Sequence, residues 1–228
     1  MDKYITFLFN HKICPIFFLN LDQRRIMAGN LTLEGSRGRK AGKMLRRVCQ
    51  ALDKAGIPYL LEAGTLLGVV RENRLLPWDN DLDVTVTREY EDKLVKSLWR
   101  IKVKGYLVRI KYYRKDMACF NKGDIRIIKV KHINLLSKVR KDIILDIFLK
   151  KRVGDEYQWT VGLNPPVLKA VPHRFYSELG RRDFSGYSFS VPADCEGYLE
   201  EHYGKQWRTP VKEWDFRTSD CSVREILS

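Results

Sequence analysis

Residues 64–83 read GTLLGVVRENRLLPWDNDLD and place three aspartates within five positions of a chain whose net charge is +14. The residues that follow continue as an alternating β-branched run, which predicts a strand over 82–87. Because successive side chains of a strand point to opposite faces, we expect Asp81 and Asp83 on one face and Leu82 and Val84 on the other. Two carboxylates about 7 Å apart on one face repel each other, and burying them is costly. The stretch therefore predicts a compensating positive charge beside Asp81 and Asp83.

A divalent cation is one such charge, because Mg²⁺ prefers hard oxygen ligands. A neutralising lysine or arginine, or an exposed acidic loop, is the alternative. Asp146 favours the cation, since it lies within the apolar run IILDIF, where a carboxylate is not placed for contact with solvent. Taken alone, Asp146 would suit an ion pair in the core. Taken with the upstream pair, it predicts a site in which Asp81, Asp83 and Asp146 hold Mg²⁺ or Mn²⁺.

The glycine turn before these acids suggests a phosphate-binding element. Gly64 and Thr65 join a predicted strand, PYLLEAG, to a short predicted helix, TLLGVVRE. Free N–H groups and the dipole at a helix start favour a phosphate, and Arg71 could reach a phosphate oxygen. An ordinary tight turn at Gly64, and a salt bridge from Arg71 to Glu62, Glu72 or an aspartate, remain the structural alternatives.

The remaining pattern predicts an α+β fold, with a mixed sheet, flanking helices and a small C-terminal cap. Helical spacing runs from about Arg39 to Gly56 and over 89–99, and the glycine-rich stretch 29–42 reads as a loop. Strands are expected over 106–113, 124–131 and 142–148, then a hairpin about Ser185 and Gly186 and a helix ended by Gly204. We expect one compact domain with three parts: an N-terminal extension (1–38), a catalytic core (39–175) and a cap that completes the site (176–228).

The composition limits the class of protein. Hydrophobic residues make up 44% and charged residues 31%, which excludes a membrane-embedded or disordered chain. The positive charge attracts anions such as nucleotides, nucleic acid, phosphorylated polymers or an acidic membrane face, or is simply a basic surface. The apolar segment 4–21 is too broken for a spanning helix and is expected to pack on the domain, with an interfacial anchor as the alternative. Five scattered cysteines suit a reducing compartment.

Two stretches resemble the LicD family, which includes the fukutin-like proteins: GTLLGVVRENRLLPWDNDLDV and, near the C-terminus, GYSFSVPADCEGYLEEHYGKQW. The resemblance runs from about residue 40 to about residue 215. It implies a nucleotidyltransferase fold and the transfer of a phospho-alcohol, phosphocholine or ribitol phosphate, from a CDP-linked donor to a glycan hydroxyl, with release of CMP. It places the reaction in lipopolysaccharide or teichoic acid biosynthesis. Asp81 and Asp83 match the family's metal-binding acids, and Asp79 matches the leading acid of its motif. Asp146 resembles the acid of the third strand. The family's phosphate-holding turn corresponds to Gly64, Thr65 and Arg71.

Three departures from the family pattern refine this expectation. Asn80 stands where aspartate is common. Because strand side chains alternate, Asn80 points away from the face of Asp81 and Asp83, so the missing charge should not abolish metal binding. The chain has no cysteine cluster for zinc, unlike the fukutin-related branch, and no evident membrane anchor. We therefore expect a cytoplasmic, microbial-type enzyme whose acceptor can be lipid-linked and whose basic surface can contact the inner membrane face.

The expected mechanism assigns roles to the same residues. Asp81, Asp83 and Asp146 hold the metal, one of Asp146 and Asp83 takes the acceptor proton, and the glycine turn with Arg71 fixes the phosphate. The alternatives are a nucleotidyltransferase acting on RNA or protein, and a non-catalytic basic nucleic-acid-binding protein, for which no motif is present. Helical spacing places Leu199 and Tyr203 in the core. Stacking on a sugar ring or on choline is the alternative role for the aromatic residues of the C-terminal segment: Tyr198, Tyr203, Trp207 and Trp214.

Overall fold

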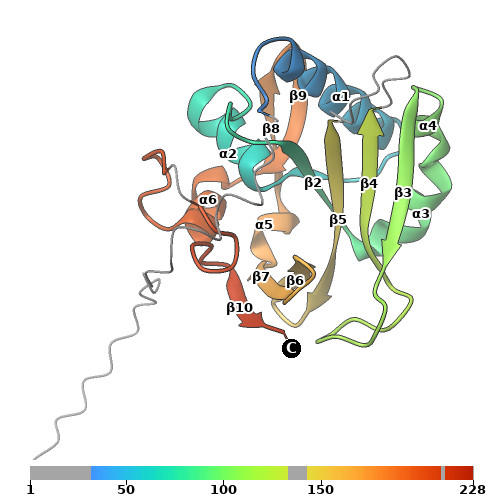
Figure 1. The fold of residues 1–228 in the computed structure, drawn as a ribbon, viewed down its shortest axis with the longest axis vertical. Coiled ribbons are helices and arrows are strands. Elements are labelled where there is room, and N and C mark those ends of the chain that lie inside the picture. Colours follow the sequence, from blue (N-terminus) through green and yellow to red (C-terminus); the bar gives the residue numbers. More distant parts are fainter. Residues whose placement is uncertain (1–31, 133–142, 212–213, 228) are drawn as a thin grey trace, which may run out of the picture.

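A mixed eight-stranded sheet forms the centre of the molecule (Figure 1). The computed structural model describes residues 32–132, 143–211 and 214–227; the predicted packing of segment 4–21 lies outside them. The strands are β1 (Leu60–Leu61), β2 (Asp81–Thr87), β3 (Tyr106–Tyr112), β4 (Ile125–His132), β5 (Ile144–Val153), β6 (Glu156–Val161), β7 (Val167–Pro172) and β10 (Val223–Ile226), with β8 (Leu179–Phe184) and β9 (Tyr187–Pro192) in a separate hairpin. The helices are α1 (Gly35–Lys54), α2 (Ala63–Glu72), the 3₁₀ turn η2 (Arg88–Tyr90), α3 (Glu91–Ser97), α4 (Trp99–Lys102), α5 (Arg174–Ser177) and α6 (Cys195–Tyr203).

The long strand β5 joins the two halves of the sheet. Its first half lies between β2, to which it is parallel, and the antiparallel β4, which in turn pairs with β3. Its second half pairs with β6, and the sheet continues through β7 to β10. The strands predicted over 82–87, 106–113, 124–131 and 142–148 are confirmed as β2 to β5, and the predicted α+β class with a mixed sheet is confirmed.

The two faces of β2 and β5 have different partners. Leu82, Val84, Leu145 and Ile147 are fully buried in the core, together with side chains of α1, α3 and α4. Figure 1 shows α3 and α4 lying beside β3. The opposite face of the same strands carries the aspartates, so this alternation places the acids away from the helical layer.

Helix α1 begins earlier than the sequence pattern indicated, and the expectation of a loop over 29–42 is wrong from Gly35 onward. The glycines that suggested a loop serve close packing instead. A Cβ atom at Gly38 would collide with the carbonyl oxygen of Leu33, and Gly42 is buried. Glycine in a helix interior costs about 1 kcal/mol relative to alanine, and the close approach of the chain explains why it is present here. The predicted end is confirmed: the N–H groups of Gly56 and Ile57 donate back to the last turn.

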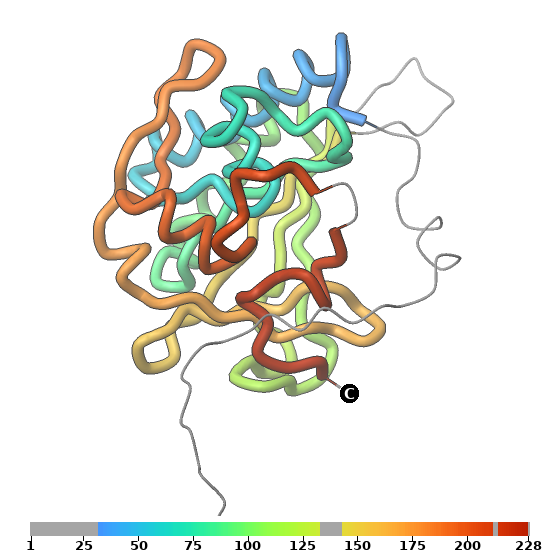
Figure 2. The backbone as a smooth tube through the Cα atoms, turned by 90° about the vertical axis from the view of Figure 1, so that its left-hand side faces the viewer, coloured from blue at the N-terminus to red at the C-terminus, as the bar shows by residue number. Residues whose placement is uncertain are grey.

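The segments after residue 175 cover one end of the sheet and also extend it. The hairpin turns at Ser185 and Gly186, both with positive φ, as the sequence predicted. Helix α6 ends at Gly204, also as predicted. Strand β10 pairs with β7, and Figure 2 shows this last segment crossing the strands in red. No described helix has both the length and the apolar character needed to span a bilayer.

Candidate active site

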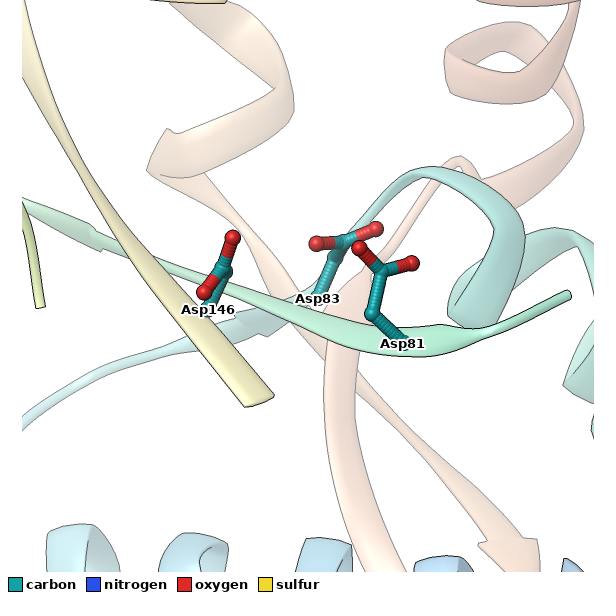
Figure 3. Close-up of side chains that lie close together, drawn as sticks. All are labelled: Asp81, Asp83 and Asp146. Atoms are coloured by element: carbon teal, nitrogen blue, oxygen red, sulfur yellow. The ribbon is translucent and has the colours of Figure 1, made fainter. Parts of the chain in front are cut away.

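Three of the predicted acids converge on one face of the sheet. Asp83 and Asp146 are register partners on the parallel strands β2 and β5, and Asp81 lies two residues before Asp83 on the same strand face. Each offers a carboxylate oxygen, and the three oxygens lie within 4.8 Å of one another. Figure 3 shows the three side chains rising from the same side of the ribbons. The alternation within β2 was readable from the sequence, whereas the pairing with Asp146 depends on the fold.

The cluster is electrostatically unfavourable without a cation. Burial and then the neighbouring Asp79 raise the pKa of Asp81 from 3.8 to about 6. Burial, with Asp81 and Asp146 nearby, raises the pKa of Asp83 well above its ordinary value. Burial also raises the pKa of Asp146, although Lys129 opposes that shift. A positive ion among these carboxylates would favour their charged forms.

The surroundings of Asp146 show that an ion pair only partly satisfies it. Its Oδ2 accepts from Nζ of Lys129 at 2.5 Å, and Lys129 lies directly across on β4. Its Oδ1 is buried without a hydrogen-bond partner among the described residues. Buried polar atoms are rarely left unpaired. An orphaned carboxylate oxygen beside two further carboxylates fits a hard divalent cation such as Mg²⁺ or Mn²⁺.

Asp79 lies beside this group, against the glycine turn. A Cβ atom at Gly64 would collide with Oδ2 of Asp79, so any larger residue there would displace the carboxylate. The N–H of Asn80 donates to Asp79 Oδ1 at 2.9 Å. Burial raises the pKa of Asp79 as well. Gly64 therefore lets the Asp79 carboxylate lie against α2, and Asp79 adds to the negative charge next to Asp81.

Thr65 fixes the start of α2 to the strand that carries the acids. Its Oγ1 accepts from the N–H of Asp83 at 2.9 Å, and the N–H of Glu62 donates to the carbonyl of Asp83 at 3.1 Å. Between them, Ala63 has a φ of +46°, a conformation that strains a residue with a side chain. Helix α2 thus begins at Ala63, two residues before the predicted start, with Glu62 at its N-cap. Thr65 is 2% exposed, and its hydroxyl oxygen serves this junction between α2 and β2.

Arg71 does not reach the acidic cluster. Its Nε and Nη2 donate to Oε1 of Glu72 at 3.1 and 2.6 Å, and its Nη1 donates to the carbonyl of Trp207 at 3.2 Å. This arrangement is the salt bridge to Glu72 that the sequence left open as the alternative to phosphate binding. In this structure Arg71 joins the last turn of α2 to the segment after α6.

Sequence reasoning missed a second group of charges on the same side of the sheet. Oε2 of Glu62 accepts from Nζ of Lys150 at 2.7 Å and from Thr85 at 2.6 Å, and Tyr198 donates to both Glu62 oxygens at 2.8 Å. Lys150 is fully buried, and its Nζ lies 3.4 Å from the centre of the Trp159 ring. Despite burial, Lys150 and His202 lower the pKa of Glu62 to about 2. The only sign of this group in the sequence was that Lys150 lies four residues after Asp146, and therefore on the same face of the strand.

The same group continues toward the C-terminus. Nζ of Lys169 donates to Oδ2 of Asp220 at 2.6 Å, and Nδ1 of His202 lies 3.3 Å from the same oxygen. His202 Nε2 is 3.4 Å from Glu62 Oε1, which connects the two ion pairs. Leu199 is 1% exposed, which confirms its predicted place in the core, and Tyr203 packs against the core while partly buried. Tyr198 is also 1% exposed. We call these six residues the buried ion network: Glu62, Lys150, Lys169, Tyr198, His202 and Asp220.

Comparisons with known proteins assign the chain to a family. The LicD/FKTN/FKRP nucleotidyltransferase domain matches residues 56–194. The chain is 26% identical over 196 residues to the ribitol-5-phosphate transferase FKTN of Macaca fascicularis, and 25% identical to that of Homo sapiens. Each match covers 85% of this chain but 39% of the relative, so the chain corresponds to well under half of those proteins. An uncharacterized protein of Rickettsia prowazekii is 25% identical over 188 residues, which cover 80% of this chain and 58% of that protein.

Among solved structures, the solution structure of the antibiotic-resistance factor ANT(2'')-Ia matches with a TM-score of 0.42 and 12% identity, over 78% of this chain and 77% of that chain. This similarity is too weak to add to the family assignment. The family match itself covers more than half of the chain, and its residues 56–194 include the glycine turn, Asp79, Asp81, Asp83 and Asp146. The chain therefore belongs to the LicD/FKTN/FKRP family of nucleotidyltransferase domains.

Proposed function

We propose that this protein transfers a phospho-alcohol group, phosphocholine or ribitol phosphate, from a CDP-linked donor to a hydroxyl of a glycan and releases CMP. Family membership supports an enzyme that moves a phospho-alcohol, because the two FKTN relatives named above are ribitol-5-phosphate transferases. A cytoplasmic reaction on a lipid-linked acceptor would suit the strongly basic surface.

The observation that carries the proposal is the convergence of Asp81, Asp83 and Asp146, with one buried oxygen of Asp146 left unpaired among the described residues. Their chemistry fits one or two Mg²⁺ or Mn²⁺ ions held by hard oxygen ligands. When bound, such an ion neutralises the charge of the donor pyrophosphate and the charge that develops on the leaving group. The three acids would be its ligands, and Asp79 would add negative charge beside them.

The remaining residues position the reactants. The acceptor oxygen forms a bond to the phosphorus that bears the alcohol, and the bond from that phosphorus to the bridging oxygen breaks, so that CMP leaves. Asp146 or Asp83 accepts the proton of the acceptor hydroxyl as general base. Gly64 allows the chain to pass close to the acids, and Thr65 holds the start of α2 against the strand that carries them. Arg71 could contact the donor only after releasing Glu72.

A CMP-release screen tests the proposal. The full chain would be incubated with CDP-choline, CDP-ribitol and CDP-glycerol, with Mg²⁺ or Mn²⁺ and with excess EDTA, and in the presence of candidate glycans. We expect metal-dependent release of CMP with one donor, and a large loss in the Asp81→Ala and Asp83→Ala variants. Equal rates in the wild type and both variants, or release that EDTA leaves unchanged, would contradict the proposal. Incorporation of label from CTP or ATP into RNA or protein would indicate nucleotidyl transfer instead.

A further inference from the structure

The segment that forms α3 and α4 is basic over most of its length. Residues 93–104 read KLVKSLWRIKVK, with five basic residues and no acidic one. The acids of α3, Glu91 and Asp92, lie in its first turn, before this stretch. A helical segment of this composition is typical of surfaces that bind an acidic partner or an anionic membrane. Which side chains could make such a contact depends on how the segment is oriented in the fold.

The helical rotation continues from α3 into α4, so one face can be followed through both helices. Leu98 joins them with φ −60° and ψ −24°, and the N–H of Val103 donates to the carbonyl of Trp99 at 2.9 Å. The inner face carries Leu94, Leu98 and Ile101, which are at most 5% exposed and belong to the core. These core contacts fix the opposite face of the segment toward the outside of the molecule.

An apolar strip lies on the outer face. Val95, Trp99 and Val103 follow one another at intervals of four residues, and their exposed fractions are 38%, 54% and 73%. Residues four apart are neighbours on a helix surface, so the three side chains form a continuous strip, which we call the apolar ridge. Figure 1 shows α3 and α4 at the outer edge of the molecule, beside β3. Single exposed apolar residues are common on proteins, whereas a continuous strip indicates a surface that a partner covers.

Cations lie on both sides of the apolar ridge. Lys96 and Lys102 are exposed, and their side chains form no ion pair within the described residues. The guanidinium of Arg100 lies 4.7 Å from the centre of the Trp99 ring, so a positive charge is held next to the largest apolar side chain of the ridge. This part of the surface therefore combines apolar area with positive charge that the chain itself does not neutralise.

This combination matches the surface of an anionic membrane. The indole ring of tryptophan is apolar but carries one N–H donor, and it favours the boundary between hydrocarbon and headgroups. Lysine side chains keep their charge in water while their methylene groups cover apolar surface, and each gains from anionic headgroups. A nucleic acid would use the cations but would leave the two valines without a partner, because its backbone is charged. The composition of the ridge and its borders therefore favours lipid.

We propose that the apolar ridge and the cations beside it bind the surface of an anionic membrane, with Trp99 and Val103 at the level of the lipid headgroups. Docking through this edge leaves the acidic cluster uncovered, because α3 and α4 pack on the face of β2 and β5 that lies opposite to the acidic side chains. The inference concerns lipid binding alone and does not depend on the proposed reaction.

Vesicle binding with matched variants tests this inference. Co-sedimentation of the full chain would be measured with vesicles of phosphatidylcholine alone and with vesicles of equal parts phosphatidylcholine and phosphatidylserine. We expect the wild type to bind the anionic vesicles at least tenfold more tightly. Trp99→Ala and Val103→Asp should each weaken that binding at least tenfold. Leu163→Asp is the control for Val103→Asp and should change binding less than twofold, because Leu163 is 70% exposed but lies in the turn between β6 and β7.

A second pair of variants tests the contribution of the cations. Lys96→Glu should weaken binding to the anionic vesicles about fivefold or more, since a cation near an anionic surface contributes about that factor. Lys205→Glu changes the net charge equally, but Lys205 is exposed in the turn after α6, so we expect a change of less than twofold.

Every other outcome counts against the proposal. Equal weakening by Val103→Asp and Leu163→Asp would mean that net charge alone controls binding, and wild-type binding by Trp99→Ala and Val103→Asp would place the contact elsewhere in the chain. No preference for anionic vesicles would overturn it as well. Tighter binding of a hexauridylate RNA than of the vesicles would indicate nucleic acid, and a change from dimer to monomer in Trp99→Ala without vesicles would indicate a second copy of the chain. CMP release in solution is a separate measurement that Trp99→Ala should leave unchanged, so a failure of the proposed reaction is distinguishable from a failure of this surface.

Discussion

Two groups of charge, one partly buried and one fully buried, lie near each other at strand β5, and they are composed in opposite ways. In the acidic cluster, Asp81, Asp83 and Asp146 bring like charges together. In the buried ion network, the carboxylate of Glu62 pairs with Lys150, and Asp220 pairs with Lys169. Strand β5 supplies a residue to each group, with Asp146 near its start and Lys150 further along the same face.

The pKa values separate the two groups. Burial acts on all of these carboxylates in the direction that favours protonation. In the network, the cations overcome this effect and lower the pKa of Glu62 to about 2, and they also lower that of Asp220. In the cluster, neighbouring acids reinforce it, and the pKa of Asp81 rises to about 6. The carboxylates of the network are therefore compensated by cations within the chain, although Nε2 of His202 is buried without a hydrogen-bond partner among the described residues. The three acids of the cluster outnumber Lys129 and are compensated only with a cation from outside.

The largest effect is expected for the loss of an acid from the cluster. Asp83→Asn keeps the shape of the side chain and the backbone hydrogen bond to Thr65, but removes one charged ligand. We expect the rate of CMP release to fall on the order of 10³-fold or more, because stabilisation of the transition state is lost. Steady-state kinetics at saturating Mg²⁺ would measure this change.

A substitution outside the cluster serves as its control. Asp53→Asn also removes one aspartate, but Asp53 lies in the last turn of α1 and contacts Arg181 of the β8–β9 hairpin. Its rate should stay within about twofold of the wild type. Retention of full activity by Asp83→Asn would remove the acidic cluster from the reaction.

The cluster and the network also differ in how far the sequence predicts them. The alternation of side chains along β2 is enough to place Asp81 and Asp83 on one face, because alternation is a local property of a strand. The register of Asp83 with Asp146 joins residues 63 positions apart and is set by how β2 and β5 pack. Glu62 meets Lys150 and Tyr198 across still longer separations, and no local pattern marks such contacts. The aspartate pattern and the family resemblance both predicted the cluster, whereas the position of Lys150 on the strand face of Asp146 did not predict its partners in the network.

A smaller effect, on stability, is expected for the loss of the cation in the network. Lys150→Met removes the lysine partner of Glu62 and leaves a carboxylate that is 2% exposed with only His202 as a neighbouring base. Breaking a buried pair in this way destabilises proteins by about 3 to 5 kcal/mol. Denaturant unfolding, followed by circular dichroism, would measure the loss in the free energy of unfolding.

The double variant Glu62→Gln/Lys150→Met checks the cause of that loss. Removing both charges should recover much of the stability lost in Lys150→Met, because no unpaired charge then remains buried. A double variant no more stable than Lys150→Met would mean that the aliphatic and aromatic packing of Lys150 on Trp159, and not its charge, stabilises this region.

The smallest expected effect is on the pH dependence of stability, which should have opposite signs for the acidic cluster and the buried ion network. The pKa of Asp81 lies near 6 in the folded chain, above its ordinary value of 3.8, so between these values the folded state binds more protons and stability falls as the pH rises. Glu62 acts in the opposite sense, since its pKa of about 2 lies below the ordinary 4.5, and its contribution to stability is lost as the pH falls from about 4.5 toward 2.

Asp83→Asn removes like-charge repulsion, so without metal at pH 7 we expect it to raise the free energy of unfolding by about 1 kcal/mol. Added Mg²⁺ should then stabilise the wild type more than the variant, because binding to the folded state alone raises stability. Unfolding curves at pH 3, 5 and 7, with and without Mg²⁺, would show these signs, and an Asp83→Asn variant less stable than the wild type in EDTA at pH 7 would contradict the contrast between the two groups.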